Sequence, residues 1–235
     1  MSERTIKRFY TTADAAEAEG GFALRLDGRP VRTPAKRPLV APTRALAEAI
    51  AAEWAAQGET FAPTSMPLTR LAHSAIDGVA DALEPTISEV AAYAGSDLVC
   101  YRALEPEELA QRQAAAFDPV LAFAEQELGA RFLLAGGIMH VAQPEDSLQA
   151  VRAAIPREPF AVTALHALAS LSGSALLALA VARGAKTAEA AWAAAHVDED
   201  FQIERWGADD EAVQRRETRG REFTAAASAL QALKG

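Results

Sequence analysis

The chain has 235 residues, a formal net charge of −9 at pH 7 and a single cysteine, Cys100. Half of the residues are hydrophobic, which suffices for a substantial core without a disulfide or a structural metal. One cysteine excludes an internal disulfide and fits a reducing compartment, and the excess of acidic residues argues against nucleic acid as the main partner because it repels phosphates.

Charge is distributed unevenly along the chain. Residues 1–50 contain nine Lys and Arg against six Asp and Glu, whereas the remaining residues contain 14 against 26. This asymmetry suggests two parts. The stretch Met1–Tyr10 carries basic pairs with no apolar run behind them, so we expect no secretory signal and a cytoplasmic protein.

Residues 1 to about 42 are predicted to form a small antiparallel sheet. In GFALRLDGRPVRTP, Phe22, Leu24 and Leu26 alternate with smaller or charged residues, and Asp27-Gly28 is typical of a tight hairpin turn. KRFYTT and PLV (residues 38–40) are expected to add short strands. Together with the first helix, these elements predict an N-terminal β-rich domain at residues 1–59.

From Thr43 onward the apolar residues follow a helical period. Thr43 is expected to cap a helix in which Leu46, Ile50 and Trp54 recur every four residues until Gly58. Residues 60–235 are predicted to form a helical bundle, so the fold class is α+β. Further helices are expected along a stripe from Leu68 to Val79, after a capping box of Thr86 and Glu89, after Pro106 with a kink or division at Pro119, and after Pro144.

Residues 160–182 carry no Asp, Glu, Lys or Arg, and 23 residues would suffice to cross a bilayer. The segment contains Thr163, Ser170 and Ser174, and much of the remainder is alanine, so its transfer into lipid is only weakly favourable. We interpret it as one helix buried on most sides, without membrane insertion.

The local signatures of an enzyme are missing from the sequence. Gly20-Gly21 and Gly136-Gly137 lack the spacing and the lysine of a phosphate-binding loop, and the four histidines are scattered singly. No serine lies in a Gly-x-Ser-x-Gly turn. We therefore expect no catalytic residues, no cofactor and no metal.

The stretch HVDEDFQIERWGADDE, residues 196–211, sets acids among large apolar side chains. If Thr187–Trp206 is one helix, an angular step of 100° per residue places Trp192, His196, Glu199, Ile203 and Trp206 along one stripe. A second, smaller apolar stripe faces the other side at Ala190, Ala194, Val197 and Phe201. A charge within the larger stripe would be costly to bury alone, so that stripe suits a surface covered by a partner.

Three interpretations of Glu199 remain open. An arginine such as Arg183 or Arg205 could satisfy it within the chain, or it could pair with a basic group on another protein. A catalytic role with Asp198, Asp200 or Asp209 is disfavoured because adjacent helical acids point about 100° apart.

Several stretches together resemble a known family. They are KRFY, LDGRPVRTPAKRPL, EWAAQ, MPLTRLAHSAID, DLVCYRA, RQAAAFDPVL, GSALLALAV and DEDFQIERWG, and they occur in order over nearly the whole chain. They resemble the chaperones that assemble the catalytic head of the F-type ATP synthase by binding its alpha subunit, in the bacterial cytoplasm or, for eukaryotic relatives, the mitochondrial matrix.

The resemblance implies a small N-terminal β domain, a helical C-terminal domain, no enzymatic activity and no bound nucleotide. It also implies a functionally important acid within Asp198–Asp200, which we assign to Glu199, with Asp198 as the neighbouring candidate. The expected partner-binding residues are Glu199, Asp198, Gln202, Ile203, Trp206 and Trp192, on a monomer.

Two alternative functions follow from the residues alone. One is a carboxylate-dependent hydrolase, with or without a divalent metal, that uses Asp198, Glu199, Asp209 and Asp210. The other is a helical adaptor for a different client.

Overall fold

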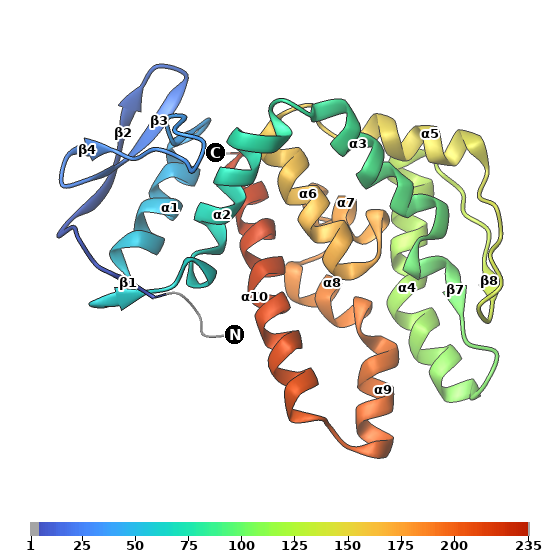
Figure 1. Ribbon diagram of the computed structural model, residues 1–235. Helices are drawn as coiled ribbons and strands as arrows, with labels where there is room; N and C mark the ends of the chain where they lie inside the picture. The colour runs from blue at the N-terminus through green and yellow to red at the C-terminus, as the bar shows by residue number, and fades with distance from the viewer. Residues whose placement is uncertain (1–4, 235) are drawn as a thin grey trace. The chain divides into compact units, whose positions relative to one another are not determined.

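The computed structural model describes residues 5–234, and Figure 1 traces the order of their helices and strands. The start of the chain, Met1–Arg4, on which the expectation about a targeting segment partly rests, lies outside the described residues. Within them the chain divides into two compact units. Unit 1 contains residues 5–83, 158–164 and 228–234, and unit 2 contains residues 84–157 and 165–227.

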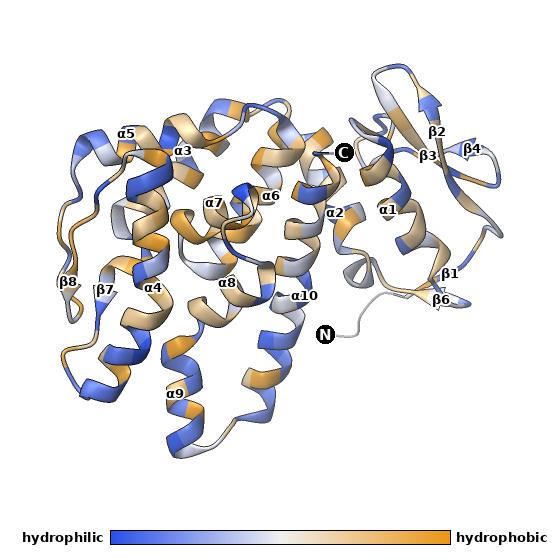
Figure 2. Ribbon diagram, turned by 180° about the vertical axis from the view of Figure 1, so that it is seen from behind, coloured by the Kyte–Doolittle hydropathy of each residue, from blue (hydrophilic) through white to orange (hydrophobic). Residues whose placement is uncertain are grey.

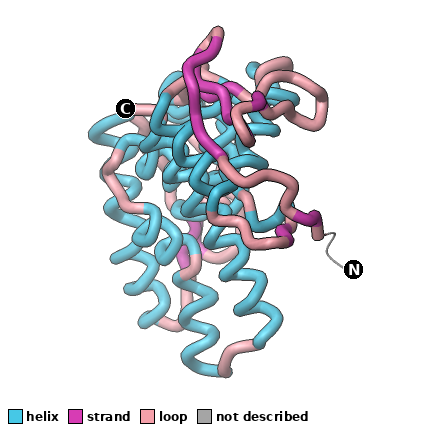
Figure 3. Tube along the Cα trace, turned by 90° about the vertical axis from the view of Figure 1, so that its left-hand side faces the viewer, coloured by secondary structure: helices cyan, strands magenta, loops and turns pink. Residues whose placement is uncertain are grey.

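These units group the chain differently from the predicted cut between residues 59 and 60, because residues 60–83 and two distant segments also belong to unit 1. The fold class is α+β, as predicted: short strands occupy the N-terminal region and helices make up most of the remainder, as Figure 3 shows. Among the helices of residues 5–234, none combines the length and the hydropathy needed to span a bilayer.

The main sheet of unit 1 is antiparallel and centres on β3 (Gly21–Leu26). It pairs along its whole length with β2 (Ala13–Ala18), and at its two ends with β4 (Arg29–Pro30) and β5 (Val40–Ala41). Asp27 and Gly28, with φ of 48° and 77°, form the predicted turn. β2 was not predicted, because its sequence ADAAEA lacks the β-branched and aromatic residues that favour strands.

Helix α1 (Arg44–Ala55) forms as predicted and packs against β2 and β3. The Thr43 side chain accepts the Leu46 amide, and Leu46, Ile50 and Trp54 are buried; the helix ends at Ala55, before Gly58. The Trp54 indole donates to the Thr69 hydroxyl at 2.9 Å. Two short strands, β1 (Ile6–Lys7) and β6 (Thr60–Phe61), pair beside it.

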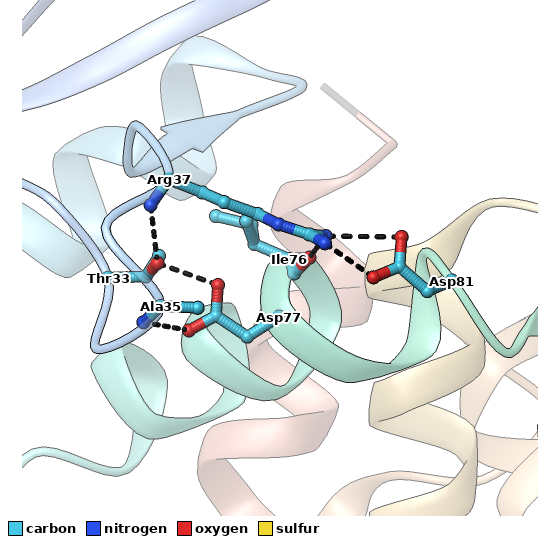
Figure 4. A network of polar contacts seen from close by, with 6 residues as sticks. All are labelled: Thr33, Ala35, Arg37, Ile76, Asp77 and Asp81. Atoms are coloured by element: carbon cyan, nitrogen blue, oxygen red, sulfur yellow. Dashed lines mark hydrogen bonds and ion pairs between the residues drawn. The ribbon is translucent and has the colours of Figure 1, made fainter.

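The predicted helix from Leu68 to Val79 is α2 (Pro67–Ser74) followed by a π-helical turn, η2 (Ala75–Val79). Figure 4 shows how η2 holds the loop of residues 33–37. The hydroxyl of Thr33 and the amide of Ala35 donate to Asp77 at 2.6 and 3.0 Å, and Arg37 donates to the Ile76 carbonyl at 2.7 Å. Burial alone would raise the pKa of Asp77, but these hydrogen bonds and the charge of Arg37 hold it below its usual value.

Unit 2 is built around α7 (Ala175–Arg183), whose residues from Ala175 to Val181 are all buried. Helices α4, α5 and α8 pack against it, and unit 2 also contains α3, α9 and the larger parts of α6 and α10. Figure 2 shows α7 mostly hydrophobic and α9 largely hydrophilic. The bounds are α3 Leu83–Ala92, α4 Glu107–Leu128, α5 Glu145–Ala154, α6 Pro159–Ser172, α8 Ala188–Ala195, α9 Val197–Trp206 and α10 Asp210–Ala232.

The uncharged segment is two helices, so the single helix predicted over residues 160–182 is wrong. Gly173 takes a left-handed φ of 73° after α6, and the Ser174 side chain caps α7 by accepting the Leu177 amide at 2.9 Å. The buried Asp97 carboxylate reinforces this start by accepting the Leu176 amide at 3.1 Å. Gly173 therefore ends α6, and Ser174 begins α7.

The start of one further helix differs from the prediction, and of the two outcomes open at Pro119 the division does not occur. α3 begins at Leu83, so Thr86 lies within the helix and does not cap it; Pro85 sits in the first turn, where its missing amide hydrogen is tolerated. α4 runs through Pro119 without dividing. Strand β7 (Tyr101–Arg102), before α4, pairs in parallel with β8 (Ala135–Gly136), after α4, at one edge of unit 2, as Figure 1 shows.

Candidate functional site

The segment predicted as one helix over Thr187–Trp206 is broken at His196 into α8 and α9. The imidazole Nδ1 of His196 donates to the Trp192 carbonyl at 2.7 Å, and the His196 amide turns to the Ala193 carbonyl at 3.1 Å. A continuous helix would pair that amide with the Trp192 carbonyl. The histidine side chain thus takes the acceptor that the helix would need, and the chain bends there.

Trp192 packs against the chain's own residues. Its ring centroid lies 4.0 Å from that of His196 and 5.2 Å from that of the buried Phe223. A Cβ atom built on Gly220 would lie 3.3 Å from the indole nitrogen, so glycine gives the ring its room. The predicted stripe is therefore divided: Trp192 and His196 turn inward, and the α9 residues that follow face outward.

The outward side of α9 carries Glu199, Gln202, Ile203 and Trp206, which we call the α9 face. Helical spacing places these four residues on one side. Trp206 is 76% exposed, Gln202 is exposed and Ile203 is half-buried. An indole this exposed at the end of a folded helix is available to another molecule.

Glu199 is held loosely. Its side chain is 43% exposed, and its carboxylate lies 3.8 Å from Nε2 of His196. Burial lowers the pKa of His196 more than the neighbouring acids raise it, so the imidazole is neutral at pH 7 and gives Glu199 no full ion pair. Arg205, one of the two predicted internal partners, pairs with Glu108 at 2.7 Å.

The two acids beside Glu199 are anchored to different helices. Asp198 accepts the side-chain amide of Gln113 at 2.7 Å, and Asp200 pairs with Arg216 of α10. Gln113 is itself buried and accepts the Ala103 amide at 2.7 Å. The three carboxylates thus diverge, as helical spacing predicts, and two of them, Asp198 and Asp200, hold α9 between α4 and α10.

A cluster around Phe201 attaches α9 to α4. Phe201 is buried, and the guanidinium groups of Arg112 and Arg205 lie 5.2 and 4.3 Å from its ring centroid. Arg112 bridges Glu204 at 2.8 Å and Glu108 at 2.9 Å. Hydrogen bonding by Arg205, with help from Arg112, lowers the pKa of Glu108. Sequence reasoning placed Phe201 on an apolar stripe but did not find this cluster, because its α4 members lie some 90 positions away in the chain.

The geometry of the acids does not assemble a metal centre. Within residues 5–234, no group of three or more His, Cys, Asp or Glu side chains is arranged to hold a metal ion. The arrangement instead offers an exposed indole beside a partly exposed carboxylate, on a helix fixed by its neighbours. Such a surface can bind a polypeptide that presents an apolar pocket and a basic group.

Comparisons with known proteins give a consistent result. The sequence model of the family described as ATP12 chaperone protein matches residues 7–125. The crystal structure of Atp12 from Paracoccus denitrificans is 42% identical, with a TM-score of 0.90, and the match covers 96% of this chain and 97% of that chain. An aspartate-to-lysine mutant of P. denitrificans Atp12p is 41% identical, with the same TM-score and coverage. A candidate chaperone from Agrobacterium tumefaciens is 47% identical, with a TM-score of 0.94, over 97% of this chain and 87% of that chain.

Proposed function

Because the chain belongs to the ATP12 family of ATP synthase assembly chaperones, we propose that it binds the unassembled alpha subunit of the F-type ATP synthase through the α9 face. In this proposal it acts as a cytoplasmic monomer, shields the surface that alpha later buries against the beta subunit, and releases alpha when beta binds. No chemical step is required, since beta can displace a chaperone that competes for the same area.

The observation that carries this proposal is the exposure of Trp206 beside Glu199. Tryptophan is strongly enriched among the residues that dominate protein interfaces, and Trp206 is 76% exposed on the same side of α9 as Ile203 and Glu199. Glu199 adds a carboxylate with no arginine or lysine bound to it within the described residues. A basic group on the client can therefore pair with it without first breaking an internal ion pair.

An aggregation assay tests the proposal. Purified alpha subunit is warmed alone and with an equimolar amount of this protein, and light scattering is followed. We expect the wild type to suppress scattering. The Glu199→Lys variant should need at least tenfold more protein for the same suppression, because it sets like charges against each other at the contact.

Glu217→Lys is the matched control, since it makes the same charge change at an exposed position of α10 and should behave as the wild type. Failure of the wild type to suppress scattering would remove the alpha subunit as client. Equal suppression by Glu199→Lys and wild type would remove Glu199 from the contact.

A further inference from the structure

A second apolar surface lies on unit 2, around the β7–β8 pair. Eight large hydrophobic residues are exposed in the part of the chain that the structure describes, and five of them gather here. We call them the β7–β8 patch: Leu104, Leu133, Leu134, Ile138 and Met139, of which Ile138 is 95% exposed. A monomer scatters single apolar side chains over its surface, whereas a gathered set marks a contact site.

The backbone beneath this patch is fixed. The side chain of Gln143 accepts the Leu133 amide at 2.8 Å and donates to the Leu133 carbonyl at 3.0 Å. The Gly137 amide bonds the Arg102 carbonyl at 2.8 Å, and a Cβ on Gly136 would lie 2.9 Å from the Leu104 side chain. The loops are thus tied to each other, so that the apolar side chains are presented by an ordered frame and bind with little loss of backbone entropy.

The rim of the patch is acidic. Glu105 and Glu107 follow Leu104 in the chain, and Glu145 and Asp146 begin α5 just after the second loop; all four are exposed. Of the nearby basic residues, Arg102 pairs with Asp118 at 2.8 Å and Arg131 pairs with Glu125 at 2.6 Å. A segment flanked by lysine or arginine complements this rim, whereas a second copy of this chain would bring like charges together.

The patch continues toward the α9 face. Figure 1 shows the loop after β7 running to the start of α4, which contacts α9. Leu104 is four residues before Glu108, and Glu108 pairs with Arg205, the neighbour of Trp206. One partner can therefore span both surfaces without crossing a buried part of unit 2.

We propose that the β7–β8 patch is a second client contact, which takes an extended apolar segment of the alpha subunit flanked by basic residues. This inference rests on the proposed function and deepens it. Glu199 and Trp206 bind one site on the client, and the patch covers a neighbouring apolar stretch. Contact at two sites on one rigid unit raises the overall affinity through effective concentration.

The test uses an Ile138→Ser, Met139→Ser double variant of the full chain, with Phe9→Ser as the matched control. Phe9 is 69% exposed but lies in unit 1, and all three side chains are open enough that serine leaves the fold intact. Binding to immobilised alpha subunit is measured at 50 and 500 mM salt. We expect the double variant to bind at least tenfold more weakly and Phe9→Ser to bind within twofold of the wild type.

A Glu105→Lys, Glu107→Lys variant addresses the rim. It should bind several-fold more weakly than the wild type at 50 mM salt and approach it at 500 mM, because salt screens exposed charges. If the wild type binds alpha and the Ile138→Ser, Met139→Ser variant binds equally well, the patch is not a client contact and the proposed function stands. If the wild type does not bind alpha at all, both proposals fall.

Sedimentation velocity of the free protein tests whether a second copy of this chain covers the patch instead. We expect a monomer for the wild type and for the double variant. A wild-type dimer that the double variant abolishes would show that a second copy covers the patch, and would overturn the inference.

Discussion

Asp97 joins two parts of unit 2 through one fully buried carboxylate. It accepts the Val99 amide at 3.2 Å and the Leu176 amide at 3.1 Å, and so fixes the start of the central helix α7. Burial raises its pKa to about 6, although hydrogen bonds from Ser174, Leu176 and Val99 oppose the shift. A buried acid with a raised pKa makes stability depend on pH.

The sign of this dependence follows from the two pKa values. The unfolded carboxyl ionises near 3.8 and the folded one near 6, so the unfolded state loses its proton first and the free energy of unfolding falls as pH rises through this window. Asp97→Asn removes the titration. We expect the free energy of unfolding of Asp97→Asn, relative to that of the wild type, to increase between pH 4 and pH 7 by an amount on the order of 3 kcal/mol.

Urea unfolding of both proteins at the two pH values measures this gain. The exposed Glu217→Gln in the same unit serves as the control and should track the wild type. An unchanged difference between Asp97→Asn and wild type at pH 4 and pH 7 would mean that the Asp97 pKa is not raised.

Single residues explain where sequence patterns succeeded and where they did not. Thr43, the Asp27-Gly28 turn and Pro106 signalled local structure because their effect depends only on adjacent backbone. His196 broke the expected helix through its own side chain, which no periodicity reveals. The apolar pairs Leu133-Leu134 and Ile138-Met139 lie on either side of the Gly136-Gly137 break. They follow no helical period, and apolar residues in such a non-helical stretch were the available sign of an exposed patch.

At the scale of elements, α9 depends on very few buried contacts. Phe201 is its one buried residue among those described, and the surrounding ion pairs are largely exposed, so each contributes little. The position of the α9 face therefore rests mainly on one aromatic ring, on the hydrogen bond between Gln113 and Asp198, and on the half-buried pair of Asp200 with Arg216. This dependence came from contacts between distant segments, which the sequence pattern did not predict.

Phe201→Ala should loosen α9 selectively. Truncation of a buried phenylalanine costs about 3–5 kcal/mol, and Phe201 is the buried residue of this ten-residue helix, whose exposed ion pairs each contribute little. We expect the amides of residues 197–206 to exchange with deuterium at least tenfold faster, while α7 stays protected. Trp206→Ala is the matched variant: its ring is exposed, so exchange should stay at the wild-type rate while client binding weakens. Equal exchange in Phe201→Ala and wild type would contradict this role for the ring.

At the scale of the whole molecule, the two units differ in how many large apolar side chains they leave exposed. Unit 1 buries most of its large apolar residues around β3, α1 and Trp54, with Ile6 and Phe9 exposed. Unit 2 leaves two sets exposed, the α9 face and the β7–β8 patch. Alternation and helical period predicted the α+β class, because both report burial along one element. They predicted the uncovered stripe only in part, since Trp206 is exposed but Trp192 packs inward against Phe223. They did not predict the β7–β8 patch, because exposure depends on how segments distant in sequence pack.

The central claim is that the α9 face is covered when the client binds. Hydrogen–deuterium exchange of this protein, free and saturated with purified alpha subunit, tests it most directly. We predict that the amides of residues 197–206 exchange at least tenfold more slowly in the complex, while those of α1 in unit 1 are unchanged. A stable complex in which residues 197–206 exchange at the free rate would contradict the account.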